Sequence, residues 1–386
     1  MELMAITSRL RRAIKAKGES TDFATIAGEY LGNYYPSSSL ILCGSGTRAL
    51  QMVFEAVKRD NPDVLIAMGD YNCPDVASAA ISIGLKVLLL PQDPESLELD
   101  VSAVRGRPVP ICLVLTNLYG LVDKLPKFEG GEVVTVVDDA CQSALSKDEG
   151  KPVGTRADFG VLSFGRGKAV PALGGGAVIT PRRFDSSICI DSSGAEAKRA
   201  FGLVDGLSGF ATFLMQRPSL YWIVNSLPFL NLGETHCSLD ISSAPISTLA
   251  SIAACAQLEQ SQKLSRCYLE NASSWHQELA ELGLAEPFIK RGFDFEGEVI
   301  PTRYPVLFDS SQKRDLVFKK LYSAGLGVST SYPHSLADFG ILQPGLGLDA
   351  IASSGDIASR IMTLPVHQYL SPKDIKRAGK LIRDCL

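Results

Sequence analysis

Short apolar runs alternate with segments of helical periodicity between residues 40 and 180. The runs are apolar throughout, which is typical of strands that are buried on both faces of a parallel sheet. The helical segments between them supply the crossovers that parallel pairing requires. The pattern predicts an α/β fold in which a mostly parallel central sheet is flanked by helices. The strands are expected at residues 40–44, 64–69, 86–90, 111–116, 133–139, 160–164 and 174–180, with the last two as neighbours.

The pattern changes in the last third of the chain. Residues 243–283 form one long stretch of helical periodicity with little to break it. It is followed by an apolar run at 302–309 and by helical segments at 313–326 and 371–386. These segments predict a smaller α+β unit, joined to the larger one by the long helix. We expect a large domain at residues 1–254, with an amphipathic helix at its N-terminus, and a small C-terminal domain at residues 255–386.

Composition narrows the class of protein. Of the 386 residues, 46% are hydrophobic and 21% are charged, which is typical of a folded globular chain. The 38 basic and 42 acidic residues leave no excess of positive charge for binding nucleic acid. The nine cysteines are scattered without a C-x-x-C pair, and the four histidines show no H-x-H or H-E-x-x-H spacing. We expect a reduced, cytoplasmic protein with no metal site and no nucleic-acid partner.

The most apolar later segment, residues 219–233, is too short to cross a bilayer and contains Pro228. It also lacks the basic face of a helix that lies on a membrane surface. We expect it to make protein contacts, in the core or at a dimer surface, with membrane-surface contact as the alternative. The first 18 residues lack the apolar core of a signal peptide, so we expect no export signal.

Three short segments follow predicted strands, at the edge where open α/β sheets bind their ligands. The first is the turn from Gly44 to Arg48, which precedes a predicted helix. Glycine lets the backbone approach an anion closely, and the free N–H groups at a helix start, with the Thr47 hydroxyl, suit a phosphate. The alternative is an ordinary helix cap after a glycine turn.

The second segment places two carboxylates at the end of an apolar strand. Asp138 and Asp139 end the strand, and Gln142 follows three residues after Asp139. A carboxylate there can hold a positive charge on a ligand, such as a protonated ring nitrogen. The alternative is a helix N-cap, for which aspartate is favoured.

The third segment is glycine-rich and runs from Ser163 to Lys168 between two predicted buried strands. Partial burial beside Arg166 would lower the pKa of Lys168. A neutral amine could then act as a Schiff-base nucleophile and a general base. The alternative is a lysine with a structural role only.

Taken together, the three segments resemble the DegT/DnrJ/StrS group of pyridoxal-phosphate enzymes, the sugar aminotransferases of fold type I. The motifs S-G-T-R-A-L, D-D-A-C-Q, S-F-G-R-G-K and G-G-G-A stand in the order of that family's N-G-T-A-A-L, E-D-A-A-Q, S-F-x-x-x-K and E-G-G-A. Lys168 follows Asp139 by 29 positions, a spacing typical of the group. The resemblance continues in N-L-Y-G at Asn117–Gly120 and covers most of the chain.

The resemblance implies an aspartate aminotransferase-like fold and pyridoxal 5′-phosphate as the cofactor. Lys168 would be the catalytic residue, forming a Schiff base with the cofactor and moving protons. Asp139 would pair with the ring nitrogen, and Gln142 would lie near the 3-hydroxyl or the face of the ring. The cofactor phosphate would be held by Ser163 and by the turn of Gly46, Thr47 and Arg48.

The implied reaction is a transamination between two small molecules. The amino donor in this family is usually glutamate, and the acceptor is usually a nucleotide-linked keto sugar used in polysaccharide or glycan-precursor synthesis. The implied assembly is a homodimer with a shared active site. Two alternatives stay open: a pyridoxal-phosphate-dependent dehydratase or eliminase, although family dehydratases replace the lysine retained here as Lys168, and a noncatalytic regulatory protein on the same scaffold.

The sequence departs from the family pattern at two places. Cys73 stands where family members place an aromatic ring against the cofactor, and Tyr71 lies two residues earlier, so that either could face the ring. Ser243 stands where the family sends an asparagine to the phosphate of the neighbouring subunit, with Pro245 in place of an arginine. Arg166 could supply the missing phosphate charge.

Overall fold

A computed structural model describes residues 23–36, 38–128, 131–165, 167–181, 238–339 and 354–386. The expected helix at the N-terminus, the apolar segment 219–233 and Arg166 lie outside the described residues.

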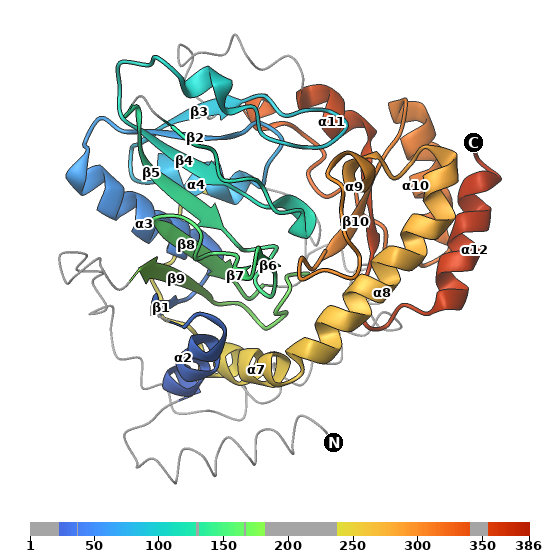
Figure 1. Cartoon of the computed structure of the whole chain (residues 1–386), viewed down its shortest axis with the longest axis horizontal. Coiled ribbons are helices and arrows are strands. Elements are labelled where there is room, and N and C mark those ends of the chain that lie inside the picture. The colour runs from blue at the N-terminus through green and yellow to red at the C-terminus, as the bar shows by residue number, and fades with distance from the viewer. Residues whose placement is uncertain (1–22, 37, 129–130, 166, 182–237, 340–353) are drawn as a thin grey trace.

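A seven-stranded sheet forms the centre of the larger part of the molecule (Figure 1). The strand order is β1-β9-β8-β5-β4-β2-β3. Strands β3, β2, β4, β5 and β8 pair in parallel, whereas β9 is antiparallel to both β8 and β1. The predicted mostly parallel sheet is confirmed, and so is the pairing of its last two strands. The strands are β1 (Ser38–Cys43), β2 (Leu65–Gly69), β3 (Lys86–Leu90), β4 (Ile111–Leu115), β5 (Val133–Asp139), β8 (Phe159–Ser163) and β9 (Gly176–Pro181).

Helices cover both faces of this sheet. Successive strand residues point to opposite faces, so that Val161 and Leu162 of β8 belong to different core clusters. Val161 packs with α3 and α4, and Leu162 packs with α2 and α7. This layering explains why the strands are apolar at every position. The helices are α2 (Phe23–Tyr34), α3 (Gly46–Asp60), α4 (Pro74–Ile81) and α7 (Thr248–Glu259).

A smaller α+β unit follows, as predicted, around the antiparallel pair β10 (Arg303–Leu307) and β11 (Ile361–Pro365). Trp275 is buried at its centre and donates its ring N–H to the carbonyl of Pro365, at 2.8 Å. The helices of this unit are α8 (Ser261–Leu279), α9 (Glu286–Lys290), α10 (Ser311–Ser323), α11 (Ser354–Arg360) and α12 (Pro372–Arg383). Shorter elements are the hairpin of β6 (Lys147–Asp148) and β7 (Lys151–Pro152) and the 3-10 turns Val101–Val104, Leu118–Gly120, Ala280–Leu282 and Leu336–Asp338.

The long helix expected at residues 243–283 is wrong in two respects. It begins only at Thr248, because the Ser247 hydroxyl caps it by accepting the N–H of Ala250. It is also interrupted at Gln260, whose φ of −103° and ψ of 8° are not helical, so α7 and α8 are separate helices. The expected domain division after residue 254 falls within α7 and stays a prediction.

Candidate active site

The three segments that follow predicted strands meet at one edge of the sheet. Ser163 and Cys43 both pair with Gly176 of β9, which places the ends of β1 and β8 on either side of that strand. The turn after β1 lies directly against β8: a Cβ built on Gly46 would lie only 2.7 Å from Cβ of Ser163 and 3.0 Å from its hydroxyl oxygen. A glycine at position 46 is what allows this approach.

The turn is the start of a capped helix. The Ser45 hydroxyl accepts the N–H of Arg48 at 3.0 Å, so the helix cap expected as the alternative to a phosphate site is present. The N–H groups of Gly46 and Thr47 lie in the first turn of α3, where a helix provides no partner of its own. Donors for an anion are therefore available beside the hydroxyl of Ser163. The guanidinium of Arg48 points along the helix to Gln51 and to Glu55, at 2.8 Å from the latter, and this arrangement does not favour a phosphate contact by its side chain.

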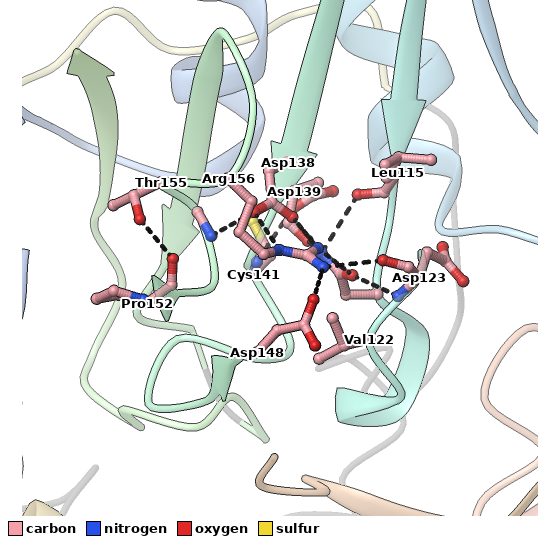
Figure 2. Close-up of polar contacts among 12 residues, drawn as sticks. Leu115, Val122, Asp123, Asp138, Asp139, Cys141, Asp148, Pro152, Thr155 and Arg156 are labelled. Carbon is pink, nitrogen blue, oxygen red and sulfur yellow. Dashed lines mark hydrogen bonds and ion pairs between the residues drawn. The ribbon is translucent and has the colours of Figure 1, made fainter. Parts of the chain in front are cut away.

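The two aspartates that end β5 have different surroundings. Asp138 is fully buried and makes a two-pronged ion pair with Arg156, at 2.6 and 2.9 Å (Figure 2). The helix-cap alternative is wrong for both residues, because residues 141–145 form turns rather than a helix. Asp139 accepts the N–H of Cys141 at 3.0 Å, and its own environment includes the charge of Lys168. Burial raises the pKa of Asp139 above its ordinary value, and the bond from Cys141 and the charge of Lys168 only partly offset this.

Lys168 is half-buried just beyond the end of β8. A Cβ built on Gly165 would lie 3.6 Å from the Ser163 hydroxyl and 3.9 Å from Cγ of Lys168, so these two side chains share one small region. Burial lowers the pKa of Lys168, but the acidic groups of Cys141, Cys73 and Asp139 raise it by more, and the net direction is upward. The expectation of a lowered pKa is therefore wrong for the protein without a ligand, because it counted burial and Arg166 but not the acids nearby.

The charge of Lys168 acts on the Cys73 thiol, so these two side chains lie in the same region. The electrostatic partners of the Cys73 thiol include Lys168 and Tyr332, and burial raises its pKa to about 11, so it is a neutral thiol at pH 7. The Tyr71 ring is fully buried, its hydroxyl lies 2.5 Å from that of Tyr119, and the edge of the ring meets Tyr332. Which of Cys73 and Tyr71 faces the cofactor ring stays a prediction.

Gln142 is held between the two parts of the molecule. Its amide oxygen accepts the N–H of Tyr119 at 2.9 Å, and its amide nitrogen donates to the hydroxyl of Tyr332 at 3.0 Å. Tyr332 comes from the C-terminal part and also stacks on Tyr119, with ring centroids 6.5 Å apart. Sequence analysis missed Tyr332, for which the only local signal was the unusual S-Y-P-H-S segment in a loop.

Ser243 and Pro245 lie on an extended segment next to the glycine turn. Both residues are exposed, and the carbonyl of Ala244 approaches Gly44 so closely that a side chain there would collide with it. The place of Ser243, beside the turn and open on its other side, is compatible with contact by a second chain. Arg166 lies outside the described residues, so its expected role stays a prediction.

The described residues show no metal site, no membrane-spanning helix and no disulfide. In the described ranges, no group of three or more His, Cys, Asp or Glu side chains could hold a metal ion. No helix in the described part of the chain is both long and apolar enough to cross a membrane. All seven cysteines that the structure describes are free thiols.

Comparison with known proteins identifies the family. A sequence model described as the DegT/DnrJ/EryC1/StrS aminotransferase family matches residues 6–209. The chain is similar to the structure of a DegT DnrJ EryC1 StrS aminotransferase from Brucella abortus, with a TM-score of 0.68, 19% identity, and coverage of 99% of this chain and 95% of that one. No curated protein matches the chain. The resemblance drawn from the motifs is thereby confirmed.

Two further solved structures share the fold but catalyse different reactions. One is PseC of Helicobacter pylori, an aminotransferase involved in the biosynthesis of pseudoaminic acid, with a TM-score of 0.70, 15% identity, and coverage of 95% of this chain and 91% of that one. The other is the Escherichia coli GDP-4-keto-6-deoxy-D-mannose-3-dehydratase with bound hydrated pyridoxal phosphate, with a TM-score of 0.70, 14% identity, and coverage of 99% and 96%. At these identities the likeness establishes the fold, and the expected fold class is confirmed.

Proposed function

We propose, since this chain belongs to the DegT/DnrJ/EryC1/StrS aminotransferase family, that it is a pyridoxal-phosphate-dependent aminotransferase acting on a keto sugar. The amino donor is an amino acid, with glutamate expected, and the acceptor is expected to be linked to a nucleotide. The observation that carries the proposal is the meeting of Lys168, Asp139 and Ser163 with the Gly46 turn at one edge of the sheet.

The residues present at this edge fit the cofactor. Its phosphate needs several donors close together, and the first N–H groups of α3 lie beside the Ser163 hydroxyl because Gly46 has no side chain. Its ring nitrogen needs an acceptor, and Asp139 supplies a buried carboxylate. Its aldehyde needs an amine, and Lys168 supplies one in the same region. These residues therefore match the phosphate, the ring nitrogen and the aldehyde of the cofactor.

Pyridoxal phosphate, when bound, supplies an aldehyde that amines attack and a ring that spreads negative charge away from the reacting carbon. Lys168 must lose its proton before its amine can bond to that aldehyde, and the raised pKa of Lys168 means that this loss is easier at alkaline pH. With its amine free, Lys168 would also be placed to move a proton at the reacting carbon. Asp139 can hold the ring nitrogen in its protonated form, provided that its own carboxyl group is ionised.

Elimination is the second candidate, because a dehydratase is among the chains that share this fold. The two outcomes differ in what happens to the donor. Transamination converts glutamate to 2-oxoglutarate, whereas elimination need not consume it. The retained Lys168 favours transamination, since the resemblance associates family dehydratases with its loss.

We further propose a cytoplasmic homodimer in which each active site is completed by the other copy. Support for the assembly comes from Ser243, which is exposed beside the glycine turn and stands at the position expected to reach the neighbouring phosphate. Support for the compartment comes from the absence of disulfides among the seven described cysteines. Size-exclusion chromatography with light scattering tests the assembly directly.

The decisive experiment is the visible absorbance spectrum of the purified protein with added pyridoxal phosphate, before and after glutamate. We expect a yellow band that bleaches with glutamate in the wild type and is missing in Lys168→Ala. Lys124→Ala is the matched control, because the Lys124 side chain is 86% exposed and pairs with Glu98 at the surface. A wild-type band that survives glutamate would favour elimination or another donor, and the absence of any band would overturn the proposal.

A further inference from the structure

Arg156 is a buried basic side chain near the proposed site, and sequence analysis gave it no role. Its side chain is 2% exposed although it comes from the loop between β7 and β8. Figure 2 shows its guanidinium at the centre of a ring of acceptors. The acceptors are both carboxylate oxygens of Asp138, Asp148 Oδ2 at 2.9 Å, the Asp123 carbonyl at 2.9 Å and Asn117 Oδ1 at 3.2 Å.

The buried carboxylate of Asp138 is paired with this guanidinium. Asp138 has no exposed surface, and among the described residues its ion-pair partner is Arg156. Its remaining bonds come from neutral groups, the Asn117 amide at 2.9 Å and the N–H of Gly154 at 2.6 Å. Asp148, by contrast, is 41% exposed and can be compensated by water. A buried carboxylate without its cation is strongly disfavoured, so removal of Arg156 would affect Asp138 first.

Asp138 is in turn coupled to Asp139 through charge and through backbone. The two are consecutive residues of β5, and the negative charge of Asp138 raises the pKa of Asp139. The Asn117 amide that donates to Asp138 also donates to the carbonyl of Asp139, at 2.9 Å. Arg156 and Asn117 therefore hold Asp138 and the carbonyl of Asp139 together and fix the end of the strand from which the Asp139 side chain projects.

We propose that Arg156 is a positioning residue which acts through Asp138 and Asn117 to keep the Asp139 carboxylate aimed at the ring nitrogen of pyridoxal phosphate. The inference rests on the proposed function. It assigns a task to a residue that does not itself reach the cofactor. It also predicts a specific defect: loss of Arg156 should weaken recognition of the ring nitrogen and not of the rest of the cofactor.

A pair of probes separates these two effects. Pyridoxal 5′-phosphate and its 1-deaza analogue differ only in the ring nitrogen, so the ratio of their dissociation constants reports what Asp139 contributes. The ratio is measured by fluorescence titration of the full-length chain at pH 7.5. We expect the wild type to prefer the nitrogen-containing ring and Arg156→Gln to lose about tenfold of that preference, because a misaimed carboxylate makes a weaker charge-assisted hydrogen bond to the ring nitrogen.

Three further variants make the test specific. Asp138→Asn added to Arg156→Gln removes both charges and should restore most of the preference. Arg156→Lys keeps the charge and should retain more of the preference than Arg156→Gln, and it remains informative if the glutamine variant does not fold. Arg314→Gln is the control, because the Arg314 side chain is also largely buried, at 11% exposed, but donates to the carbonyls of Ala358 and Ile361 in the smaller unit.

The outcomes separate the inference from the function on which it rests. If the wild type binds neither probe, the proposed function fails. If the wild type prefers pyridoxal phosphate and Arg156→Gln keeps that preference, the proposed function stands and the inference is overturned. An equal loss of affinity for both probes in Arg156→Gln, without rescue by Asp138→Asn, would also overturn it, because it would show a purely structural role.

Discussion

Gly46→Ala tests the close packing on which the proposed phosphate site depends. The new Cβ would lie 2.7 Å from Cβ of Ser163, 3.0 Å from its hydroxyl oxygen and 3.2 Å from Sγ of Cys141. The first of these contacts is shorter than real Cβ atoms tolerate, and Ser163 belongs to a central strand that cannot move without disturbing its two neighbours. The helix or the strand must therefore shift.

The expected magnitude follows from two opposing contributions. Glycine to alanine in a helix stabilises by about 0.5–1 kcal/mol when there is space for the methyl group. Forcing an extra carbon into a packed site costs about 1–3 kcal/mol. We therefore expect a net loss of about 1–2 kcal/mol in the free energy of unfolding for Gly46→Ala. Gly32→Ala in α2 is the control, because nothing lies within 4 Å of its added Cβ, and it should be neutral or stabilising.

The assay is urea denaturation followed by circular dichroism, with the slope of the transition checked for constancy. Ser163→Gly in the Gly46→Ala background removes the atoms that collide, so the two substitutions should couple favourably by about 1 kcal/mol. Cofactor affinity should fall in Gly46→Ala and not in Gly32→Ala. Additive effects of the two substitutions, together with unchanged affinity in Gly46→Ala, would refute the argument that the turn is pressed against β8.

Two further predictions concern other contacts. Tyr332→Phe should keep the stacking on Tyr119 but lose the bond from Gln142, at a cost of about 0.5–1.5 kcal/mol in urea denaturation; a larger loss than for Tyr119→Ala would contradict it. The Asp374 carboxylate accepts hydrogen bonds from the N–H and the hydroxyl of Ser371 at the start of α12, and these bonds lower the pKa of Asp374 below the ordinary 3.8. The ionised carboxylate therefore stabilises the folded protein fully above about pH 4, and this stabilisation is lost as the pH falls through the pKa of Asp374 in the folded state. At pH 7, Asp374→Asn should therefore reduce the free energy of unfolding by about 0.3–1 kcal/mol, measured as a lower thermal midpoint. Near pH 2 the variant and the wild type should have the same midpoint, and a difference that persists there would contradict this prediction.

Much of the fold could be predicted because burial on both faces leaves a clear mark on sequence. Each of the seven strands overlaps an apolar run. Helical segments separate most of these runs, and this alternation along the chain is typical of a sheet that helices cover on both faces. The break between α7 and α8 could not be predicted, because Gln260 is an ordinary helix former and its conformation comes from packing of the two helices against different parts of the molecule.

Part of the site could be predicted because parallel strands bring their carboxyl ends together. The rule that ligands bind at the carboxyl ends of parallel strands predicts the Gly46 turn, Asp139 and the segment of Ser163 and Lys168 at one edge of the sheet. It gave no direction for the pKa of Lys168, because the acids around it come from elements distant in sequence. The rule also could not show that the guanidinium of Arg48 turns away to Glu55.

The sequence does not show which of the adjacent acids Asp138 and Asp139 faces the ligand. Consecutive strand residues face opposite sides of a sheet, so two adjacent acids cannot serve the same site, but their order gives no sign of which one faces the ligand. The distinction comes from Arg156, which lies 18 positions after Asp138, and a single arginine in a polar loop is usually solvated. The β6–β7 hairpin and the turn at Asn117 surround it and exclude water, so Asp138 becomes a paired structural acid. Asp139 is bonded only by the N–H and the thiol of Cys141 among the described residues and lies near the charge of Lys168, so it is the acid that we propose for a positively charged ligand.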